Sequence, residues 1–529
     1  MVNTNIFSTK NKSRGPAANA VNAAGGKAYD NGAEQALAQL ASTGCMGDTF
    51  YADATDQTKK IIELAAKVSP EFIGKTAVYA RQKGYMKDMP ALLCAILAAN
   101  KNQESLIVLK KIFPKVMNNS KMMRNFVQII RSGELGRKSM GTAVKKLVQN
   151  WFDSRSVDQL FKDSIGTTPS MADVIKMVHP KPSTPEHAKF YAYMIGKEVG
   201  IESLPGLVKD YELYKKTSKG SIPDVPFQLL TSLNLGTDEW TEIAKTAPWH
   251  MTRMNLNTFE RHGVFKKSKM VDLVAERLRS EADIKKSKVF PYQLFAAYSN
   301  VEPSVPMKIK NALQDALEIA TSNIPQIKGK VLICVDVSRS MQSPITGQRG
   351  SATSKVQCID AATLIAASIL RINPDAVVVP FSDRLYEQFY LNPKDSIVTN
   401  ANKLKMLPSG GTACWLPLFQ ANQQNESYDA VIMLSDNESW VNTRNGYTIS
   451  GVSASTDAMS EWLKLKSRNK SAKLINIDIT PNSTSQFANQ KDVLNIGGMS
   501  DNVFSLIADF IENGNNPSFW VDTIKNVTI

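Results

Sequence analysis

The feature that most constrains the fold is a series of short apolar runs in the C-terminal part of the chain. The first run, Val331–Val335, ends directly in Asp336. Strands that alternate with helices form βαβ units, which place the strands side by side in a parallel sheet. We therefore predict an α/β domain here, with its binding site at the carboxyl ends of the strands. The later apolar runs lie at 376–381, 430–434 and 474–479, and helical segments lie at 360–370 and 503–511.

A helical pattern occupies the chain before this region. Between about residues 56 and 320, short stretches with helically spaced apolar residues follow one another, with polar breaks and almost no β signal. One stretch starts near Ser120, a predicted N-cap, and ends before Gly133. Another begins with Ser170 and Asp173 at capping-box spacing. This succession is typical of an α-solenoid of stacked helix pairs, although the sequence has no strict period.

Length and composition agree with a multidomain globular protein. At roughly 100–200 residues per domain, a chain of 529 residues contains two to four domains. Its 43% hydrophobic and 21% charged residues exclude extensive disorder. We predict a flexible arm over residues 1–17, a helical-repeat domain over 18–325, and the α/β domain over 326–529.

Cysteine usage and hydropathy indicate where in the cell the protein is expected. The five cysteines are widely spaced and form no Cys-x-x-Cys pair, which excludes a disulfide framework and a thiolate zinc site. The N-terminus lacks the apolar core of a signal peptide. The longest uncharged apolar run, Ala91–Ala99, is far shorter than the about 20 residues that span a bilayer. We predict a soluble, cytoplasmic protein without a membrane partner.

The net charge of +14 is concentrated in the helical part of the chain. Residues 1–326 contain 45 basic and 31 acidic residues, whereas residues 327–529 contain 18 of each. The window 101–150 alone has 11 basic and 2 acidic residues. A solvated, lysine-rich surface would explain a high isoelectric point, but clustering of the cations in one domain favours a polyanionic partner. Clustered cations bind a phosphate backbone favourably, because their binding releases the counterions condensed on it.

The sharpest local motif follows the first predicted strand. A carboxylate and two hydroxyls stand at alternate positions from Asp336 to Ser340, where all three can face one hard cation. Oxygen ligands suit Mg²⁺ or Mn²⁺. The order resembles the metal-ion-dependent adhesion site of von Willebrand factor A domains, although a locally capped turn remains an alternative. The predicted ligands of a divalent cation are Asp336, Ser338, Ser340, Thr412 and Asp436.

Catalytic machinery is not visible in the sequence. Gly74-Lys75-Thr76 resembles the end of a P-loop, but Ser69 stands where the first glycine should be. The four histidines form no His-Glu-x-x-His motif, and no nucleophile elbow is present. We therefore predict a protein that is not an enzyme, with a nuclease as a distant alternative.

Basic residues near aromatic residues suggest contacts to RNA, since bases stack and phosphates pair with cations. Each candidate has a structural alternative. The lysines can form a solvated helix face, His179 can cap the helix before it, and Trp249 and Phe259 can belong to the core. The predicted RNA-binding residues are Arg137, Lys138, Lys145, Lys146, Lys176, His179 and Lys181, with Arg253 and Asn255 as a second group.

Several dispersed segments together resemble one family. The stretch Gly74–Leu93 is similar to the signature of TROVE modules, as are Gly136-Arg-Lys and the segments Lys145–Trp151, His179-Pro-Lys-Pro and Ala247–Phe259. With a von Willebrand factor A domain behind them, the chain resembles the Ro autoantigen family, as a bacterial or phage orthologue. The resemblance covers roughly residues 18–515, and the tail after Gly514 matches no pattern of the family.

The resemblance implies a fold and a function. The expected fold is a ring of HEAT-like helical repeats joined to an α/β von Willebrand factor A domain. The family binds small noncoding Y RNAs on a basic outer surface and single-stranded 3′ ends of misfolded RNAs in the ring. We therefore expect a ribonucleoprotein component acting in RNA quality control, with an exoribonuclease such as polynucleotide phosphorylase as a further partner. The alternative is a protein-binding scaffold whose magnesium site captures an acidic partner.

Overall fold

The computed structural model describes residues 15–529 except 45, 47, 167, 288, 290, 322–323, 325, 346, 348–355, 387, 442, 445–446, 449–455, 481 and 499–501. The predicted arm over 1–17 therefore falls almost entirely outside the described residues. The described chain forms two compact units. One, the α/β unit, contains residues 15–68, 291–296 and 321–526, and the other, the helical unit, contains residues 69–289, 297–320 and 527–529.

The α/β unit is built on a five-stranded parallel sheet with the strand order β10-β8-β5-β3-β4. All four apolar runs predicted from the sequence are strands of this sheet. Every residue of β3, β5 and β10 is buried, as expected for a parallel sheet that is covered on both faces. The strands are β3 (Val331–Asp336), β4 (Val377–Phe381), β5 (Ala430–Ser435), β8 (Lys473–Asp478) and β10 (Val493–Gly497).

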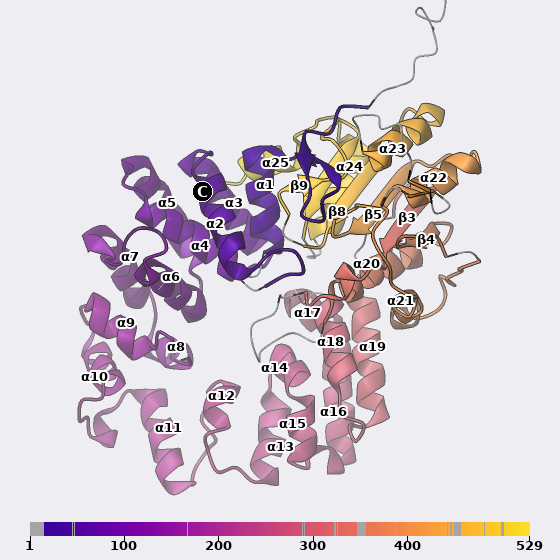
Figure 1. The fold of residues 1–529 in the computed structure, drawn as a ribbon. Coiled ribbons are helices and arrows are strands. Elements are labelled where there is room, and N and C mark those ends of the chain that lie inside the picture. Colours follow the sequence, from indigo (N-terminus) through magenta and orange to yellow (C-terminus); the bar gives the residue numbers. More distant parts are fainter. Residues whose placement is uncertain are drawn as a thin grey trace, which may run out of the picture. The chain divides into compact units, whose positions relative to one another are not determined.

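Helices connect and cover these strands (Figure 1). Leu332 and Cys334, at alternate positions of β3, share an apolar cluster with Trp415 and with Trp462 of α23. This alternation gives the sheet two apolar faces and fixes the register of each strand. The helices of the unit are α20 (Cys358–Ile372), α21 (Ile397–Lys405), α22 (Leu416–Gln423), α23 (Asp457–Arg468), α24 (Asn502–Asn513) and α25 (Phe519–Lys525).

The N-terminal segment also belongs to the α/β unit. Its strands β1 (Ala20–Val21) and β2 (Lys27–Asp30) form a hairpin, and β2 pairs antiparallel with β9 (Thr484–Ser485). Tyr29 is buried in the same apolar cluster as Trp462. Helix α1 (Gly32–Thr43) packs against β10 and α25, and α2 (Ala54–Ala65) packs against α1. The predicted helical-repeat domain over 18–325 included this segment, whereas the structure groups residues 15–68 with the α/β unit. The hydrophobic periodicity of these residues does not reveal which sheet they cover.

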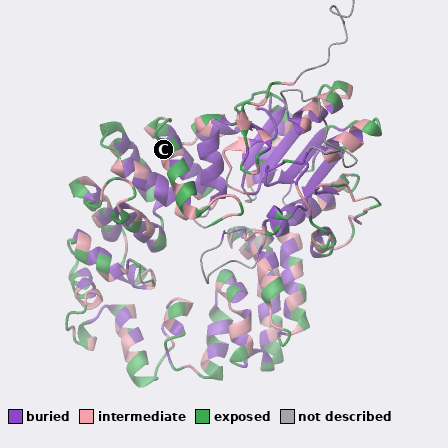
Figure 2. Cartoon of the chain, viewed as in Figure 1, coloured by how far each residue is buried: buried purple, intermediate pink, exposed green. Residues whose placement is uncertain are grey.

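The helical unit is a succession of short helices, as predicted. Its first helices pack as neighbours, α3 with α4 and α5, and α4 with α6. Figure 2 shows buried and exposed faces alternating along these helices. The helices wholly within this unit are α3 (Pro70–Gln82), α4 (Asp88–Ala99), α5 (Gln103–Val116), α6 (Ser120–Ser132), α7 (Gly141–Asp153), α8 (Val157–Lys162), α9 (Met171–Val178), α10 (Pro185–Met194), α11 (Gly206–Thr217), α12 (Phe227–Leu230), α13 (Thr237–Thr246), α14 (Trp249–Met254), α15 (Leu256–Arg261), α16 (Ser268–Arg279) and α17 (Glu281–Ser287). Two more helices divide between the units: α18 (Pro291–Asn300) contributes residues 297–300 to this one, and α19 (Met307–Thr321) contributes all but its last residue.

Local signals explain where individual helices begin and end. Ser170 and Asp173 form the predicted capping box at the start of α9. Gly133 ends α6 with a φ of 89°, a conformation that glycine adopts without strain. The N-cap of α6 is Asn119 rather than the predicted Ser120, since the Asn119 side chain accepts the hydrogen bond from the backbone N–H of Met122 (3.0 Å). Asparagine and serine are comparable caps, so the sequence alone could not separate them.

The aromatic residues of the helical unit belong to its core. Trp249 and Phe259 are buried, as the structural alternative in the sequence predicted. The indole N–H of Trp249 donates to the carbonyl of Leu278 (3.1 Å), and that of Trp151 donates to the carbonyl of Met117 (2.7 Å). These rings stabilise helix packing and are not free to stack on bases.

Candidate metal centre and nucleic-acid interface

The first loop of the candidate metal centre follows β3. Asp336 ends the strand, and its Oδ1 accepts a hydrogen bond from the backbone N–H of Ser338 (2.8 Å). The hydroxyls of Ser338 and Ser340 lie 3.2 Å apart. The local turn considered as an alternative is therefore formed. It also brings the carboxylate and both hydroxyls to one side of the loop, so the turn and the metal site are compatible.

The second loop brings Thr412 to the same end of the sheet. The backbone N–H of Arg339 donates to the carbonyl of Gly410 (3.0 Å), which joins the two loops. A Cβ on Gly410 would lie 2.4 Å from the carboxylate of Asp383, and one on Gly411 would lie 2.8 Å from the ring of Trp440. A side chain at either position would have to displace these neighbours, so the two glycines permit the close approach predicted from this motif.

The third loop follows β5. Ser435, the last residue of the strand, donates its hydroxyl to Oδ2 of Asp336 (2.6 Å). Asp436 comes next, and its carboxylate is hydrogen-bonded to the side chain of Ser340. The structure thus brings together all five predicted ligands, each of which is buried: Asp336, Ser338, Ser340, Thr412 and Asp436.

Electrostatics make this arrangement costly without a cation. Burial, and after it the nearby charge of Asp436, raises the pKa of Asp336 to about 7. Burial likewise raises the pKa of Asp436, although its hydrogen bond with Ser340 opposes the shift. Within the described part of the chain, neither carboxylate forms an ion pair with a basic side chain. Two buried carboxylates without a basic partner favour a bound cation.

The donor set fits a hard divalent cation. It contains two carboxylates and three hydroxyls, and oxygen ligands are those that Mg²⁺ prefers. Among the described residues, no three His, Cys, Asp or Glu side chains gather into a metal cluster, so hydroxyls must complete any coordination sphere. The residues present therefore suit Mg²⁺ or Mn²⁺ with some of its water retained.

Three residues near this site were not predicted from the sequence: Ser435, Glu438 and Tyr51. Ser435 and Glu438 lie on either side of Asp436, so proximity to the motif could have drawn attention to them. Glu438 is buried, and burial raises its pKa to about 7. Tyr51 comes from the loop between α1 and α2 and carries no motif. Its hydroxyl is hydrogen-bonded to the side chain of Ser340.

A first group of exposed cations lies on α7, on α9 and on the segments that flank them. Gln149 of α7 donates its side-chain amide to the carbonyls of Val178 (2.7 Å) and His179 (3.3 Å), which fixes α7 against the end of α9. Lys145 lies one turn before Gln149 on the same face. We call this group the α7–α9 cation surface, and its exposed members are Lys138, Lys145, Lys146, Lys176, His179 and Lys181.

His179 is held outward by its backbone. It has a φ of 51°, in the left-handed region, and its N–H closes α9 on the carbonyl of Ile175 (2.9 Å). Its carbonyl accepts from Gln149, while its side chain remains exposed. The backbone of His179, and not its side chain, therefore caps α9. The imidazole remains exposed to solvent.

A second group of cations joins parts of the helical unit that are distant in sequence. The pKa of Lys87 is lowered first by desolvation and then by the charges of Lys121 and Arg81, which therefore lie nearby. The pKa of His250 is lowered by desolvation and then by Arg253 and Lys87. The connection between α3 and α4 therefore lies near α14. We call these five residues the α3–α14 cation cluster.

Three predicted RNA contacts have structural roles. Arg137 is half-buried and donates to the carbonyls of Ser139 (2.7 Å) and Ala98 (2.6 Å). Arg253 is buried, with its guanidinium 6.0 Å from the ring of Trp249. Asn255 is half-buried and donates to the carbonyl of Met251 (2.8 Å). These side chains support the cationic surfaces rather than form their exposed part.

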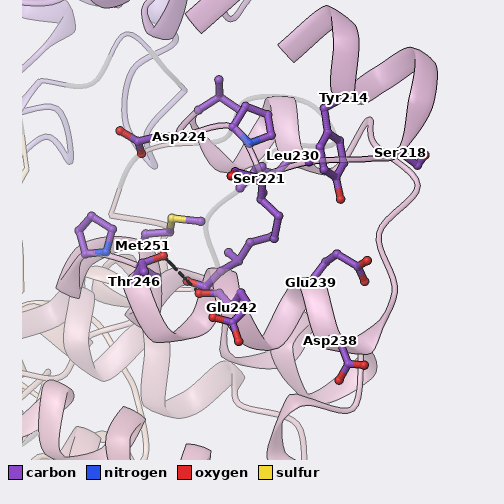
Figure 3. A pocket seen from close by; sticks show the side chains of 17 residues that line it. Tyr214, Ser218, Ser221, Asp224, Leu230, Asp238, Glu239, Glu242, Thr246 and Met251 are labelled. Carbon is purple, nitrogen blue, oxygen red and sulfur yellow. Dashed lines mark hydrogen bonds between the residues drawn. The ribbon is translucent and has the colours of Figure 1, made fainter. Parts of the chain in front are cut away.

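The helical unit also contains a cavity of about 720 Å³, lined by residues of α11, α13 and the segment between them (Figure 3). Figure 3 shows Tyr214 and Leu230 beside the carboxylates of Glu239 and Glu242. Three of its acidic residues pair with lysines: Asp224 with Lys162, Asp238 with Lys267, and Glu242 with Lys245. The lining contains four acidic residues and no basic one, so this cavity offers a phosphate no cation to bind.

Comparison with known proteins shows which domain the α/β unit resembles. The family model described as the Ro60 vWA domain matches residues 330–511, which include the loops of all five predicted metal ligands. A curated relative from Deinococcus radiodurans, named RNA-binding protein RO60, is 24% identical over 454 residues, covering 79% of this chain and 83% of the relative. The α/β unit thus resembles a Ro60 vWA domain, and most of the chain is similar to a bacterial protein named RO60.

Further similarities agree with this resemblance. The RNA-binding protein RO60 of Caenorhabditis elegans is 28% identical over 187 residues, covering 32% of this chain and 27% of that protein. The crystal structure of the Ro (RSR) protein of D. radiodurans matches with a TM-score of 0.61 at 20% identity, covering 90% of this chain and 99% of that one. The predicted fold class, a helical-repeat region followed by a von Willebrand factor A (vWA) domain, is confirmed. No helix in the described part of the chain is both long and apolar enough to cross a bilayer.

Proposed function

We propose that this protein binds RNA through the cations of its helical unit. One observation carries the proposal: cations of the helical unit gather into two groups, the α7–α9 cation surface and the α3–α14 cation cluster, and all of them except Arg81 and Arg253 are exposed. Clustered cations are stabilised by phosphates, which release their condensed counterions on binding. The names of the D. radiodurans and C. elegans relatives support the same class of ligand.

The two cation groups suit different parts of an RNA. The α7–α9 cation surface is a set of exposed side chains on adjacent helices, which suits the backbone of a folded, Y-like RNA. In the α3–α14 cation cluster, the side chains of Lys87 and His250 are exposed, and partial desolvation by their neighbours lowers the pKa of each. A compact cluster formed by two connections that are distant in sequence suits a single strand better than a duplex. We assign it to single-stranded 3′ ends of misfolded RNAs.

The proposed role is noncoding RNA quality control in the cytoplasm, without catalysis by this chain. The support for a role without catalysis is that the relatives are named RNA-binding proteins. Any degradation of the bound RNA would require a partner exoribonuclease, such as polynucleotide phosphorylase. The helical unit would then select RNAs by their structure and their free ends.

We further propose that the vWA domain binds Mg²⁺ or Mn²⁺ through its five buried oxygen-bearing residues. The support is the pair of buried carboxylates, Asp336 and Asp436, without a basic partner among the described residues. A bound divalent cation would neutralise both charges and hold the three loops together. If one coordination position stays open, the ion could also accept a carboxylate from an acidic partner protein. This is the second candidate function.

The test of RNA binding compares three labelled RNAs at fixed salt. These are a blunt duplex, the same duplex with a single-stranded 3′ overhang, and a Y-like stem-loop. We expect the overhang and the stem-loop to bind more tightly than the blunt duplex. Equal affinity for all three would mean that the helical unit is a nonspecific polycation. A magnesium-dependent loss of intact RNA would instead indicate nuclease activity.

A further inference from the structure

The N-terminal hairpin holds the third loop of the metal centre. The turn between β1 and β2 faces this loop: the side-chain amide of Asn22 donates to the carbonyl of Ser439 (2.9 Å), and the backbone N–H of Ala24 donates to Oε2 of Glu438 (3.0 Å). Gly26 packs so closely that a Cβ there would lie 1.9 Å from the carbonyl oxygen of Ser439. The loop that carries Asp436 is therefore fixed from outside the sheet by residues of the N-terminal segment.

A second part of this segment reaches the metal ligands themselves. Tyr51 lies in the loop between α1 and α2, and its hydroxyl is hydrogen-bonded to the side chain of Ser340. The same hydroxyl is near enough to the carboxylates of Asp436, Glu438 and Asp336 for their charges to act on it. Tyr51 thus lies near three of the residues that would bind the cation, Ser340, Asp436 and Asp336.

The loop that carries Tyr51 is short and locally braced. Thr49 and Ala52 exchange hydrogen bonds, with the backbone N–H of Thr49 2.8 Å from the carbonyl of Ala52. Asp53 then caps α2 by accepting from the N–H of Asp56 (2.7 Å). The ring of Tyr51 contacts that of Phe50, which is 54% exposed. These contacts brace the loop on either side of Tyr51, while Phe50 beside it stays exposed.

We propose that Tyr51 covers the metal centre of the vWA domain and takes the place that a carboxylate from a partner protein would otherwise occupy. The inference rests on the proposed metal site and specifies its ligand. The phenol hydroxyl faces a bound cation directly or through one water molecule. The adhesion-type site is then closed by the protein's own N-terminal segment, and capture of an acidic partner requires the loop of Tyr51 to move aside.

The test uses the full chain with Mn²⁺ as the metal and acetate as the carboxylate probe. Calorimetry measures Mn²⁺ affinity, and water-proton relaxation of bound Mn²⁺ reports exchangeable water and its displacement by acetate. The variants are Tyr51→Ala, which opens the site, and Tyr51→Phe, which removes only the hydroxyl. Tyr390→Ala is the matched control, because Tyr390 is a tyrosine of the same unit that is 76% exposed.

We expect wild type and Tyr390→Ala to bind Mn²⁺ but to take up acetate weakly. Both Tyr51 variants should show higher relaxation, since water replaces the hydroxyl. If the covered state outnumbers the open state about tenfold, Tyr51→Ala should bind acetate about tenfold more tightly than wild type. Equal relaxation and equal acetate affinity in all four proteins would overturn the role of Tyr51 while leaving the metal site intact. Absence of Mn²⁺ binding from all four would overturn both.

Discussion

The lysine pair of α7 provides a quantitative test of RNA binding. Lys145 and Lys146 are exposed, and neither forms an ion pair with a described residue. Replacing both with alanine removes two positive charges while preserving helix propensity, since alanine is the best helix former. The substitution should therefore weaken RNA binding without unfolding α7, which circular dichroism and thermal melting can verify.

The magnitude follows from counterion release. Each cation that binds a phosphate contributes about 0.7 to 0.9 to the slope of log affinity against log salt concentration, so two lysines contribute about 1.4 to 1.8. Between about 50 and about 200 mM salt, the affinity of wild type should fall about 7- to 12-fold further than that of the double variant. The difference between the proteins should be largest at low salt and should shrink as salt rises.

The assay is fluorescence anisotropy with the overhang RNA over a series of salt concentrations. The matched control replaces Lys215 and Lys216, another adjacent and exposed lysine pair, which lies at the end of α11 beside the acidic cavity. The control variant should keep the wild-type slope. An unchanged slope in the α7 variant would show that its lysines are only a solvated helix face. Equal losses in both variants would show that net charge alone controls binding.

Three further predictions concern the α/β unit. Asp336→Ala should abolish Mn²⁺ binding in calorimetry and leave RNA affinity unchanged, so retained Mn²⁺ affinity would refute the ligand assignment. Burial raises the pKa of Glu438 to about 7 from an ordinary value of 4.5, so the folded state holds its proton more tightly than the unfolded state. Without divalent cations, the free energy of unfolding should therefore fall by on the order of 3 kcal/mol as pH rises from about 4.5 to about 7. Glu438→Gln should lose this part of the pH dependence in urea titrations, and overlapping profiles for variant and wild type would contradict the reasoning. Gly26→Ala should lower the unfolding free energy by about 1–3 kcal/mol, because its Cβ collides with the carbonyl of Ser439. The control Gly206→Ala, whose Cβ meets no atom within 4 Å, should cost less, and equal urea midpoints for the two would contradict this packing.

The α/β fold and the meeting of the three loops that carry the proposed metal ligands could be predicted because their signals are local in sequence. Each buried strand is a continuous apolar run, and Asp336 and Asp436 stand where two of these runs end. Parallel pairing brings such ends to one edge of the sheet, so separate motifs converge without any knowledge of distances. The strand Val493–Gly497 was not predicted, because a five-residue strand that ends in glycine has little to distinguish it from a loop.

The role of the N-terminal segment could not be predicted. Tyr29 enters the core of the vWA domain and Tyr51 reaches its metal loops, but a single tyrosine in a loop has no periodicity that identifies its partner. The same limit applies to the α3–α14 cation cluster. Lys87 and His250 are brought together by the path of the helices, and nothing in either local sequence indicates the other.

Exposure could be predicted for lysines more reliably than for arginines. Lys145 and Lys146 lie off the apolar face of an amphipathic helix, which places them in solvent. Arg137 and Arg253 also lie in basic segments, yet they are half-buried and buried respectively. A guanidinium has five donors and can satisfy backbone carbonyls inside a helical unit, so charge alone does not indicate its exposure.

Binding of RNA by the helical unit can be tested by ultraviolet cross-linking of the full chain to a labelled RNA with a 3′ overhang, followed by peptide mapping. We expect cross-linked peptides from the α7–α9 cation surface and from the α3–α14 cation cluster, with few from residues 330–511. Cross-links concentrated in the vWA domain, or spread evenly over the chain, would contradict RNA binding by these two groups.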